Sequence, residues 1–344
     1  MTTLRLPIDS LAKFAAAALV KAGVSTADAA TAARYMLESD LAGQDGHGIF
    51  RLPANIANLR GGRIAPHADV RIVHEAPASA LIDGGNGLGH LVMAKATEVA
   101  IAKAKTQGSA WVGVRSSNHA GAASVWACAM LPHDMIGLYF AVGPNLMAPW
   151  GGVERMLGTN PLAIAVPALE EPPVVLDMAT SVAANGKILT ARQRGEMMPE
   201  GWVMDNKGQP ITDPKRADEG TIVPVGEYKG YALSLMIGLI AGTLNEAAFG
   251  RDNTFDKSPN NAGQAVCAIS LEQFGDVTAF KRRVDIVVRE IRGSGRLPGV
   301  EAIRLPGERS HAVRVDRLAN GVTIPPGLKT ALDKLAADLG IAPL

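Results

Sequence analysis

The chain has 344 residues, 47% of them hydrophobic and 19% charged, which is typical of a globular protein with a large buried core. The 34 Lys and Arg nearly balance the 33 Asp and Glu, and no basic stripe alternates with aromatic residues, so we expect no nucleic-acid partner. The longest apolar run, 231–243, is roughly half the length that crosses a bilayer, so we expect no membrane partner.

The cysteines and the N-terminus indicate a reducing compartment. Cys128 and Cys267 each lie within an apolar run, where a thiol behaves as a small hydrophobic group. A disulfide framework or a zinc centre needs more sulfur, so we expect no metal site. At the N-terminus, Asp9 precedes an amphipathic helical pattern that does not match a secretory signal peptide. These features predict a cytoplasmic protein.

The first part of the chain predicts helices, and the middle predicts strands that alternate with helices. Apolar residues recur every three or four positions across 8–43, and the break at Gly23 and Ser25 supplies a C-cap glycine and an N-cap serine, so a helical hairpin is expected there. From about residue 78, short β-branched runs are separated by helical stretches, which is typical of α/β layers. The runs are SALID, AWVGVRS, IGLYFAV, LAIAVP and PVVLDMA, and the helical stretches are LVMAKATEVAIAKAKTQG and GYALSLMIGLIAGTLNEAAF.

The C-terminal third predicts a loop, a strand and two helices. A stretch rich in Asn, Asp, Ser and Pro at 251–263 predicts a loop, and AVCAISL after it predicts a strand. The charged run 276–292 predicts a long helix. In the final segment, from residue 295 onward, we predict one helix at 325–340, because prolines mark its start and a glycine marks its end.

A glycine fingerprint for a dinucleotide is missing from the sequence. In GGNGLGH, His90 stands where the third glycine of G-x-G-x-x-G belongs, and in GSGRLP, Pro298 stands there. Both stretches are more typical of ordinary turns. If a dinucleotide binds to this chain, another part of the backbone must hold its pyrophosphate.

Segment 45–53, DGHGIFRLP, places a histidine between two glycines and an arginine four residues later. Glycines let backbone and ligand approach closely, a histidine exchanges protons near neutral pH, and a guanidinium forks onto a carboxylate. His47 and Arg51 are therefore candidates for a proton carrier and a carboxylate anchor. The alternative is a helix C-cap followed by a surface histidine.

Segment 116–123, SSNHAGAA, follows a predicted strand and precedes a helix that carries Trp126. Small residues at the start of a helix leave unpaired N–H groups, which favour an anion such as a pyrophosphate. His119 lies within this segment. The alternative is simple N-capping of the helix by Ser or Asn.

Two further segments contain candidate site residues. Asp177 ends an apolar strand, a position where ligand groups gather in open α/β sheets but also where an aspartate often caps a helix. Lys229 stands at the head of the longest apolar helix, which fits a cofactor phosphate or carboxamide as well as a plain solvated lysine. The remaining histidines show no metal-ligand spacing and are interpreted as structural or surface residues: His67, His74, His90, His133 and His311.

In order and spacing, these segments resemble the malate/L-lactate dehydrogenase family across nearly the whole chain. The motifs that carry the resemblance are GHGIFRLP, SNHAGAAS, APWGG, LGTNPLAIAVP, DMATSVAANGK, EYKGYALSLM and IRLPGER. The resemblance implies an α/β, mixed-sheet, non-Rossmann NAD(P)-binding fold with a helical N-terminal piece, and a homodimer with its active site near the subunit interface. Three parts are expected: a helical segment at 1–75 that packs with the C-terminal segment, an α/β cofactor-binding and catalytic body at 76–290, and a C-terminal segment at 291–344 that returns to the N-terminal lobe.

The resemblance also implies roles for individual residues. His47 would exchange the substrate proton, and His119 is the second candidate because the matching histidine is the base in some relatives. Arg51 would hold the substrate carboxylate. The residues implied to lie near the substrate are Thr159, Asn185, Gly186 and Lys187. The residues implied to line the cofactor, NAD or NADP, are His119, Ala120, Gly121, Ala122, Ala123, Asp177, Met178, Ala179, Tyr228, Lys229, Gly307, Glu308 and Arg309.

The leading hypothesis is hydride transfer between the nicotinamide and a small 2-hydroxy acid or 2-oxo acid. Two residues depart from the family pattern: Gly46 stands where a serine is usual, and Lys187 stands where the imine-reducing members have aspartate. The loss of both weakens the alternative of a reductase for a cyclic imine carboxylate or a keto-sugar acid. A missing serine also removes a partner that orients His47, which leaves a third hypothesis, a dinucleotide-binding protein with impaired catalysis. The acid and the choice between NAD and NADP stay open.

Overall fold

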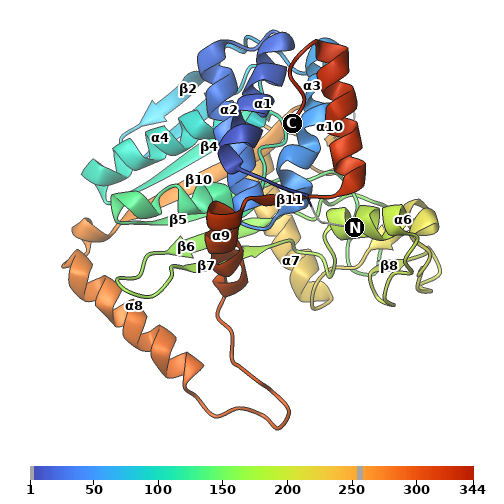
Figure 1. Ribbon diagram of the computed structural model, residues 1–344. Helices are drawn as coiled ribbons and strands as arrows, with labels where there is room; N and C mark the ends of the chain where they lie inside the picture. Colours follow the sequence, from blue (N-terminus) through green and yellow to red (C-terminus); the bar gives the residue numbers. More distant parts are fainter. Residues whose placement is uncertain (1–3, 254–258) are drawn as a thin grey trace.

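The computed structural model describes residues 4–253 and 259–344 and is built around a seven-stranded mixed sheet (Figure 1). The strands lie in the order β2-β3-β4-β10-β5-β6-β7, in which β3 and β4 run parallel and the other neighbours run antiparallel. A mostly antiparallel sheet differs from the parallel sheet of a Rossmann fold. The strands span Arg71–Ala76 (β2), Ser79–Asp83 (β3), Ser109–Ser117 (β4), Met135–Ala141 (β5), Leu162–Val166 (β6), Val174–Met178 (β7) and Ala262–Ser270 (β10).

Helices cover both faces of this sheet. Helix α4 (Gly89–Gln107) and the short helix α5 (Ala123–Cys128) pack on one face, where the largest apolar core lies. The wholly buried Trp126 is in that core, and its indole N–H donates to the carbonyl of Ala120 at 2.8 Å. The opposite face packs against α7 (Tyr228–Ile237) and the turn that follows it. Burial on both faces explains why these strands read as nearly continuous apolar runs.

A separate helical lobe holds the two ends of the described chain together. The antiparallel pair β1 (Leu4–Leu6) and β11 (Val322–Ile324) joins the N-terminal and C-terminal segments. In α2, the predicted N-cap Ser25 accepts a hydrogen bond from the Asp28 N–H at 3.1 Å. Apolar faces of the lobe's helices form a second core. These helices are α1 (Ile8–Lys21), α2 (Thr26–Leu41), α3 (Leu52–Arg60) and α10 (Pro326–Leu339).

A third, smaller group of elements contains the short pair β8 (Val203–Met204) and β9 (Thr221–Ile222) together with helix α6 (Asn185–Arg194). Its own apolar core includes Met147 and Ile188. In Figure 1 this group lies to the right of the sheet, away from α8. The chain therefore buries its apolar residues in several cores rather than one.

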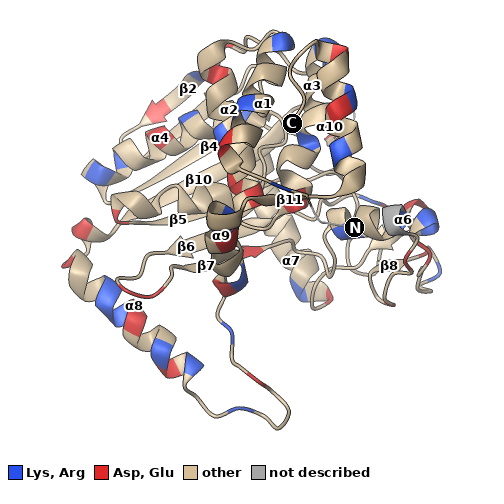
Figure 2. Cartoon of the chain, viewed as in Figure 1, with Lys and Arg blue, Asp and Glu red and all other residues tan. Residues whose placement is uncertain are grey.

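Helix α8 (Val277–Arg292) extends from the edge of the body, and the segment after it loops outward before the chain returns at α9 (Glu308–Asn320) (Figure 1). Asp276 caps α8, as its carboxylate accepts from the Ala279 N–H at 2.7 Å. Both signs of charge alternate along this helix (Figure 2). Alternating charge is typical of a helix with a large solvated surface.

The prediction of a single helix after residue 295 is wrong, because α9 precedes α10. None of the residues of α9 is fully buried, and its apolar residues Val315 and Leu318 are exposed, so the helix has no buried apolar face. It is held instead by polar contacts to α2, including the pair of Arg314 with Glu38. The predicted loop at 251–263 includes positions 254–258, which lie outside the described residues.

The predicted long apolar helix at 230–249 is also interrupted. The α-helix ends at Ile237 and continues as a wider turn at Gly238–Gly242 and a tight turn at Thr243–Asn245. The ring of Phe249 occupies the space that a Cβ on Gly238 would need, so the glycine lets the chain fold back on itself. Within the described residues, we find no helix with both the length and the apolar character needed to cross a membrane.

Candidate active site

Two histidines far apart in the sequence form a close pair. His47 ends the 3₁₀ turn η1 (Asp45–His47), and His119 follows strand β4. Their rings are parallel within 6°, and His47 Nδ1 lies 3.0 Å from His119 Nε2. At this distance one nitrogen donates and the other accepts, so each ring fixes the orientation of the other. His119 thus provides a hydrogen-bond partner for His47 although Gly46 offers no side chain.

Burial and neighbouring charge keep both rings neutral near pH 7. Burial is the main cause that lowers the pKa of His47, and the Arg51 charge lowers it further, whereas Asp177 opposes the shift. Burial also lowers the pKa of His119 well below its usual value, and His47 and Arg51 add to the effect. A neutral imidazole can accept a proton, which is what a general base needs.

Arg51 has a guanidinium with free donors. It ends the turn η2 (Ile49–Arg51), and its Nε donates to the carbonyl of Gly46 at 2.8 Å. In the described part of the chain, its two terminal nitrogens have no hydrogen-bond or ion-pair partner. A half-buried guanidinium with a free fork is suited to a carboxylate from outside the chain.

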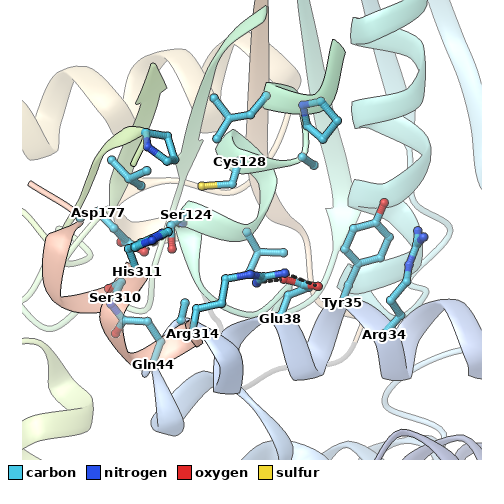
Figure 3. Close-up of a pocket in the computed structure, with 18 of the residues that line it drawn as sticks. Arg34, Tyr35, Glu38, Gln44, Ser124, Cys128, Asp177, Ser310, His311 and Arg314 are labelled. Atoms are coloured by element: carbon cyan, nitrogen blue, oxygen red, sulfur yellow. Dashed lines mark hydrogen bonds and ion pairs between the residues drawn. The ribbon is translucent and has the colours of Figure 1, made fainter. Parts of the chain in front are cut away.

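A cavity of about 820 Å³ lies between α2, α5, β7 and α9 (Figure 3). Asp177, at the end of β7, lines the cavity. Its negative charge also raises the pKa of His47, so Asp177 lies near both the cavity and the histidine pair. The Asp177 carboxylate accepts from the Ser124 N–H at 2.9 Å, a donor in the first turn of α5, although the N-cap residue of that helix is Ala122. The other lining residues are Arg34, Tyr35, Glu38, Ala42, Gln44, Val125, Cys128, Ala129, Leu131, Pro132, His133, Pro173, Val175, Gly307, Ser310, His311 and Arg314.

The predicted cofactor segment 119–123 does not itself line this cavity, but it leads directly into Ser124, which does. Ala120, Ala122 and Ala123 are buried beneath the site, and the Ala122 N–H donates to Ser39 Oγ at 3.0 Å. Gly121 has a φ of +83°, and a Cβ there would lie 2.9 Å from the same hydroxyl, so glycine is required at this turn. The segment therefore fixes His119 by a close fit against α2.

The predicted segment 307–309 divides between the cavity and the surface. Gly307 lines the cavity with a φ of +91°, and a Cβ there would lie 2.9 Å from the side chain of Val175. Glu308 instead forms an ion pair with Arg292 at 2.8 Å. Arg309 is exposed. Of the three, only Gly307 borders the cavity.

The other predicted residues gather away from the cavity. The Thr180 N–H donates to the carbonyl of Thr159 at 3.0 Å, which brings Thr159 beside the segment that follows Met178 and Ala179. Val225 donates to the carbonyl of Thr180, which places the start of α7, with the exposed Tyr228 and Lys229, at the same end of β7. Asn185, Gly186 and Lys187 begin α6, and no described hydrogen bond connects them to the histidine pair.

Several cavity residues are not among the sequence predictions. Glu38 and Arg314 form an ion pair inside it although 276 positions separate them, and the guanidinium of Arg34 stacks over the Tyr35 ring at 4.4 Å (Figure 3). His133 and His311, interpreted as structural or surface residues, are exposed and also line the cavity. No local motif indicates these residues, because α2 and α9 meet only in the folded chain.

The lining of the cavity fits a dinucleotide. Its volume is within the range of about 300–1,000 Å³ that is typical of ligand sites. Val125, Leu131 and Val175 supply apolar walls, and Ser310 supplies a hydroxyl donor, while the terminal nitrogens of Arg314 in the same wall bind Glu38. Burial raises the pKa of the Cys128 thiol to about 12, so this cysteine is an inert part of the wall.

Comparisons with known proteins agree with this geometry. The sequence model of the malate/L-lactate dehydrogenase family matches residues 6–333. The chain is 35% identical over 347 residues to a malate dehydrogenase of Pyrococcus abyssi, with 98% of this chain and 95% of that protein covered. The solved sulfolactate dehydrogenase of Methanocaldococcus jannaschii is 38% identical, with a TM-score of 0.90 over 98% of each chain. The solved malate dehydrogenase of Entamoeba histolytica is 29% identical, with a TM-score of 0.95 over 99% of each chain.

The fold and the histidine pair, taken with these relatives, define the class: the protein is a nicotinamide-dependent oxidoreductase that acts on CH–OH groups. Within that class, the chain belongs to the malate/L-lactate dehydrogenase family. The predicted family, the predicted mixed-sheet α/β fold class and the predicted dehydrogenase activity are therefore confirmed.

Proposed function

We propose that the protein interconverts a small 2-hydroxy acid and its 2-oxo acid, with His47 as the proton carrier and Arg51 as the carboxylate anchor. The observation that carries this proposal is the His47–His119 pair beside the Arg51 guanidinium, whose two terminal nitrogens have no partner among the described residues. In the oxidative direction, the neutral His47 accepts the hydroxyl proton while Arg51 holds the carboxylate. In the reductive direction, protonated His47 returns a proton to the carbonyl oxygen. His119 orients His47 through the 3.0 Å contact.

The cavity beside Asp177 is the proposed cofactor site. When bound, NAD or NADP supplies the hydride acceptor or donor that the side chains of this protein cannot supply. Gly307 leaves the backbone at the start of α9 open toward the cavity, and Ser310 places a hydroxyl donor along it. Of the remaining residues assigned by resemblance, Thr159, Tyr228 and Lys229 share the end of β7 with Asp177, which supports roles near the reacting end. Asn185, Gly186 and Lys187 stay proposed substrate contacts.

An assay panel tests the function. Purified protein is mixed with pyruvate, oxaloacetate, 2,3-diketogulonate or piperideine-2-carboxylate and with NADH or NADPH, and nicotinamide absorbance is followed. The proposal predicts loss of absorbance with the simple 2-oxo acids. Turnover confined to the imine or to the keto-sugar acid would replace it with the alternative reductase. Stabilisation by NADH or NADPH without any turnover would identify a dinucleotide-binding protein with impaired catalysis.

We also infer that the protein works as a homodimer. Apolar side chains are exposed along α7 and the turns after it: Leu233, Met236 and Leu239 recur every three residues, and Leu244 follows in the last turn, each with 37–63% of its surface exposed. Contiguous exposed apolar surface of this kind is typical of a protein contact. Light scattering of the purified protein should give twice the chain mass, and a monomer mass at micromolar concentration would contradict the inference.

The proposed location is the cytoplasm. Cys128 and Cys267 are both unpaired, which agrees with a reducing compartment. Fractionation of cells that express the tagged chain tests this location.

A further inference from the structure

Asp40 is a buried carboxylate directly beneath the loop that carries His47 and Arg51. It lies in the last turn of α2 with only 2% of its surface exposed. Its Oδ2 accepts a hydrogen bond from the Ile49 N–H at 2.8 Å. This contact joins α2 to the middle of segment 45–51.

The backbone of the loop is fitted closely over this carboxylate. A Cβ built on Gly48 would fall within the carboxylate group of Asp40, so no other residue could occupy position 48 without moving the loop. Gly46, two residues earlier, has open space around its missing Cβ. The need for glycine is therefore specific to the position that faces Asp40.

The rest of the loop moves with the Asp40 contact because it is hydrogen-bonded internally. The Arg51 N–H donates to the carbonyl of Gly48 at 2.9 Å, and its Nε donates to the carbonyl of Gly46. Ile49 is fully buried below it. A shift of the backbone at Gly48 and Ile49 would therefore displace both His47 and Arg51.

The carboxyl group is costly to keep at this position. Burial raises the pKa of Asp40 to about 7, although the Ile49 N–H opposes the shift. The charged groups that face it are Asp45 of η1, which raises the pKa, and Arg317 of α9, which lowers it. Arg317 binds the Asp40 backbone carbonyl and the Asp45 carboxylate, and among the described residues no cation forms an ion pair with the Asp40 side chain. An apolar residue would fill the space at lower cost, so a positioning role accounts for the carboxylate better than packing does.

We propose that Asp40 is a positioning residue of the active site, whose carboxylate holds segment 45–51 in the conformation that pairs His47 with His119 and aims Arg51 at the substrate. The inference rests on the roles proposed above for His47 and Arg51. A displacement of about 1 Å in such groups can lower turnover roughly a hundredfold.

The main test compares Asp40→Ala with Asp40→Asn in the purified enzyme. Asp40→Ala removes the acceptor for Ile49, so we expect kcat to fall about tenfold to a hundredfold and the Ile49 amide to exchange hydrogen faster. Asp40→Asn keeps an acceptor oxygen, so kcat and amide protection should return to within a few-fold of the parent. The matched control is Asp285→Ala. Asp285 is equally buried and accepts three backbone N–H groups from loop 169–171, so its loss should loosen that loop and leave kcat unchanged.

A double-mutant cycle keeps the inference testable if Asp40→Ala folds poorly. Gly48→Ala should lower kcat by pushing the loop off the carboxylate, and the double variant Asp40→Ala/Gly48→Ala should be less impaired than the two single effects combined, because the removed carboxylate makes room for the new methyl group. Independent effects in this cycle, or parental kcat and parental Ile49 protection in Asp40→Ala, would overturn the inference. A parent enzyme without turnover on any 2-oxo acid overturns the proposed function instead, and Ile49 exchange then tests the positioning role alone.

Discussion

The two sides of the active site are built differently. His119 and Asp177 stand at the ends of β4 and β7, which are fixed by strand pairing, with one register shift where β4 meets β10 near Ser117, and by the core around Trp126. His47 and Arg51 stand on two short 3₁₀ turns. The Asp40 side chain of α2 binds the backbone of this loop, because its carboxylate accepts from the Ile49 N–H. The first side depends on the stability of the whole sheet, and the second depends on a few local contacts.

Because of this difference, substitutions on the two sides should affect catalysis and stability to different degrees. Apart from the buried Ile49, the residues of loop 45–51 lie outside the apolar cores, so changes to them should alter catalysis more than folding. Substitution of buried residues beneath the strands should instead lower stability more than catalysis.

Substitution of the loop histidine should have the largest effect. His47→Ala is expected to lower kcat by about two to four powers of ten, because a general base contributes that much, while the Kd for NADH or NADPH changes little. Steady-state kinetics and dinucleotide titration measure the two quantities. His74→Ala, on an exposed strand position, serves as the control. Unchanged turnover in His47→Ala would remove this residue from the mechanism.

A core substitution beneath the sheet should show the opposite behaviour. Ile82 on β3 is wholly buried, so Ile82→Ala should lower the free energy of unfolding by about 2–5 kcal/mol with kcat preserved well below Tm. Its cross-strand partner Ile72 is 37% exposed, and Ile72→Ala should cost much less. Denaturant unfolding checks both variants. Equal losses in the two variants would mean that the difference in burial between Ile82 and Ile72 does not set the cost of the substitution.

The anchor role of Arg51 predicts an effect on substrate affinity. An ammonium cannot reproduce the forked contact with a carboxylate, so Arg51→Lys should raise KM about tenfold or more with a smaller change in kcat. Arg60→Lys, at the exposed end of α3, should change neither quantity. An unaltered KM in Arg51→Lys would refute the anchor role.

The pH dependence should report the surroundings of His47. Oxidation requires the neutral imidazole, so kcat/KM should fall as the pH drops through the pKa of His47. Because burial and Arg51 lower that pKa, the fall should lie below the usual value of about 6.5. A pH profile of kcat/KM for the oxidative reaction measures this pKa, and the fall on the acid side should disappear in His47→Ala. A fall at or above pH 7 would show that the environment raises the pKa instead.

Most of the elements follow from local patterns. The β-branched runs become β3 to β7, and the Ser25 and Gly340 signals mark the ends of the helices where they were expected. Helix α9 and the interruption after Ile237 could not be predicted in this way. The first lacks a buried stripe, and the second depends on Phe249, which folds back onto Gly238 from a distance in the chain.

The candidate site is predictable to the extent that its residues belong to motifs. The motifs around His47, Arg51, His119, Asp177 and Gly307 indicate them individually, but Glu38, Arg314 and Asp40 stand in helical sequence with no chemical signature of their own. Their contacts join elements that are distant in the chain, such as α2 and α9.

The sequence by itself determines the residue types and the local turns: glycines beside His47 that permit a tight loop, and apolar runs that must pair into a sheet. Only the tertiary structure decides that His47 meets His119, that Asp40 lies beneath Gly48, and that a cavity opens between α2 and α9. The physical reason is that short-range propensity acts over a few residues. Desolvation, pKa shifts and ion pairs between distant segments arise only after the chain has packed.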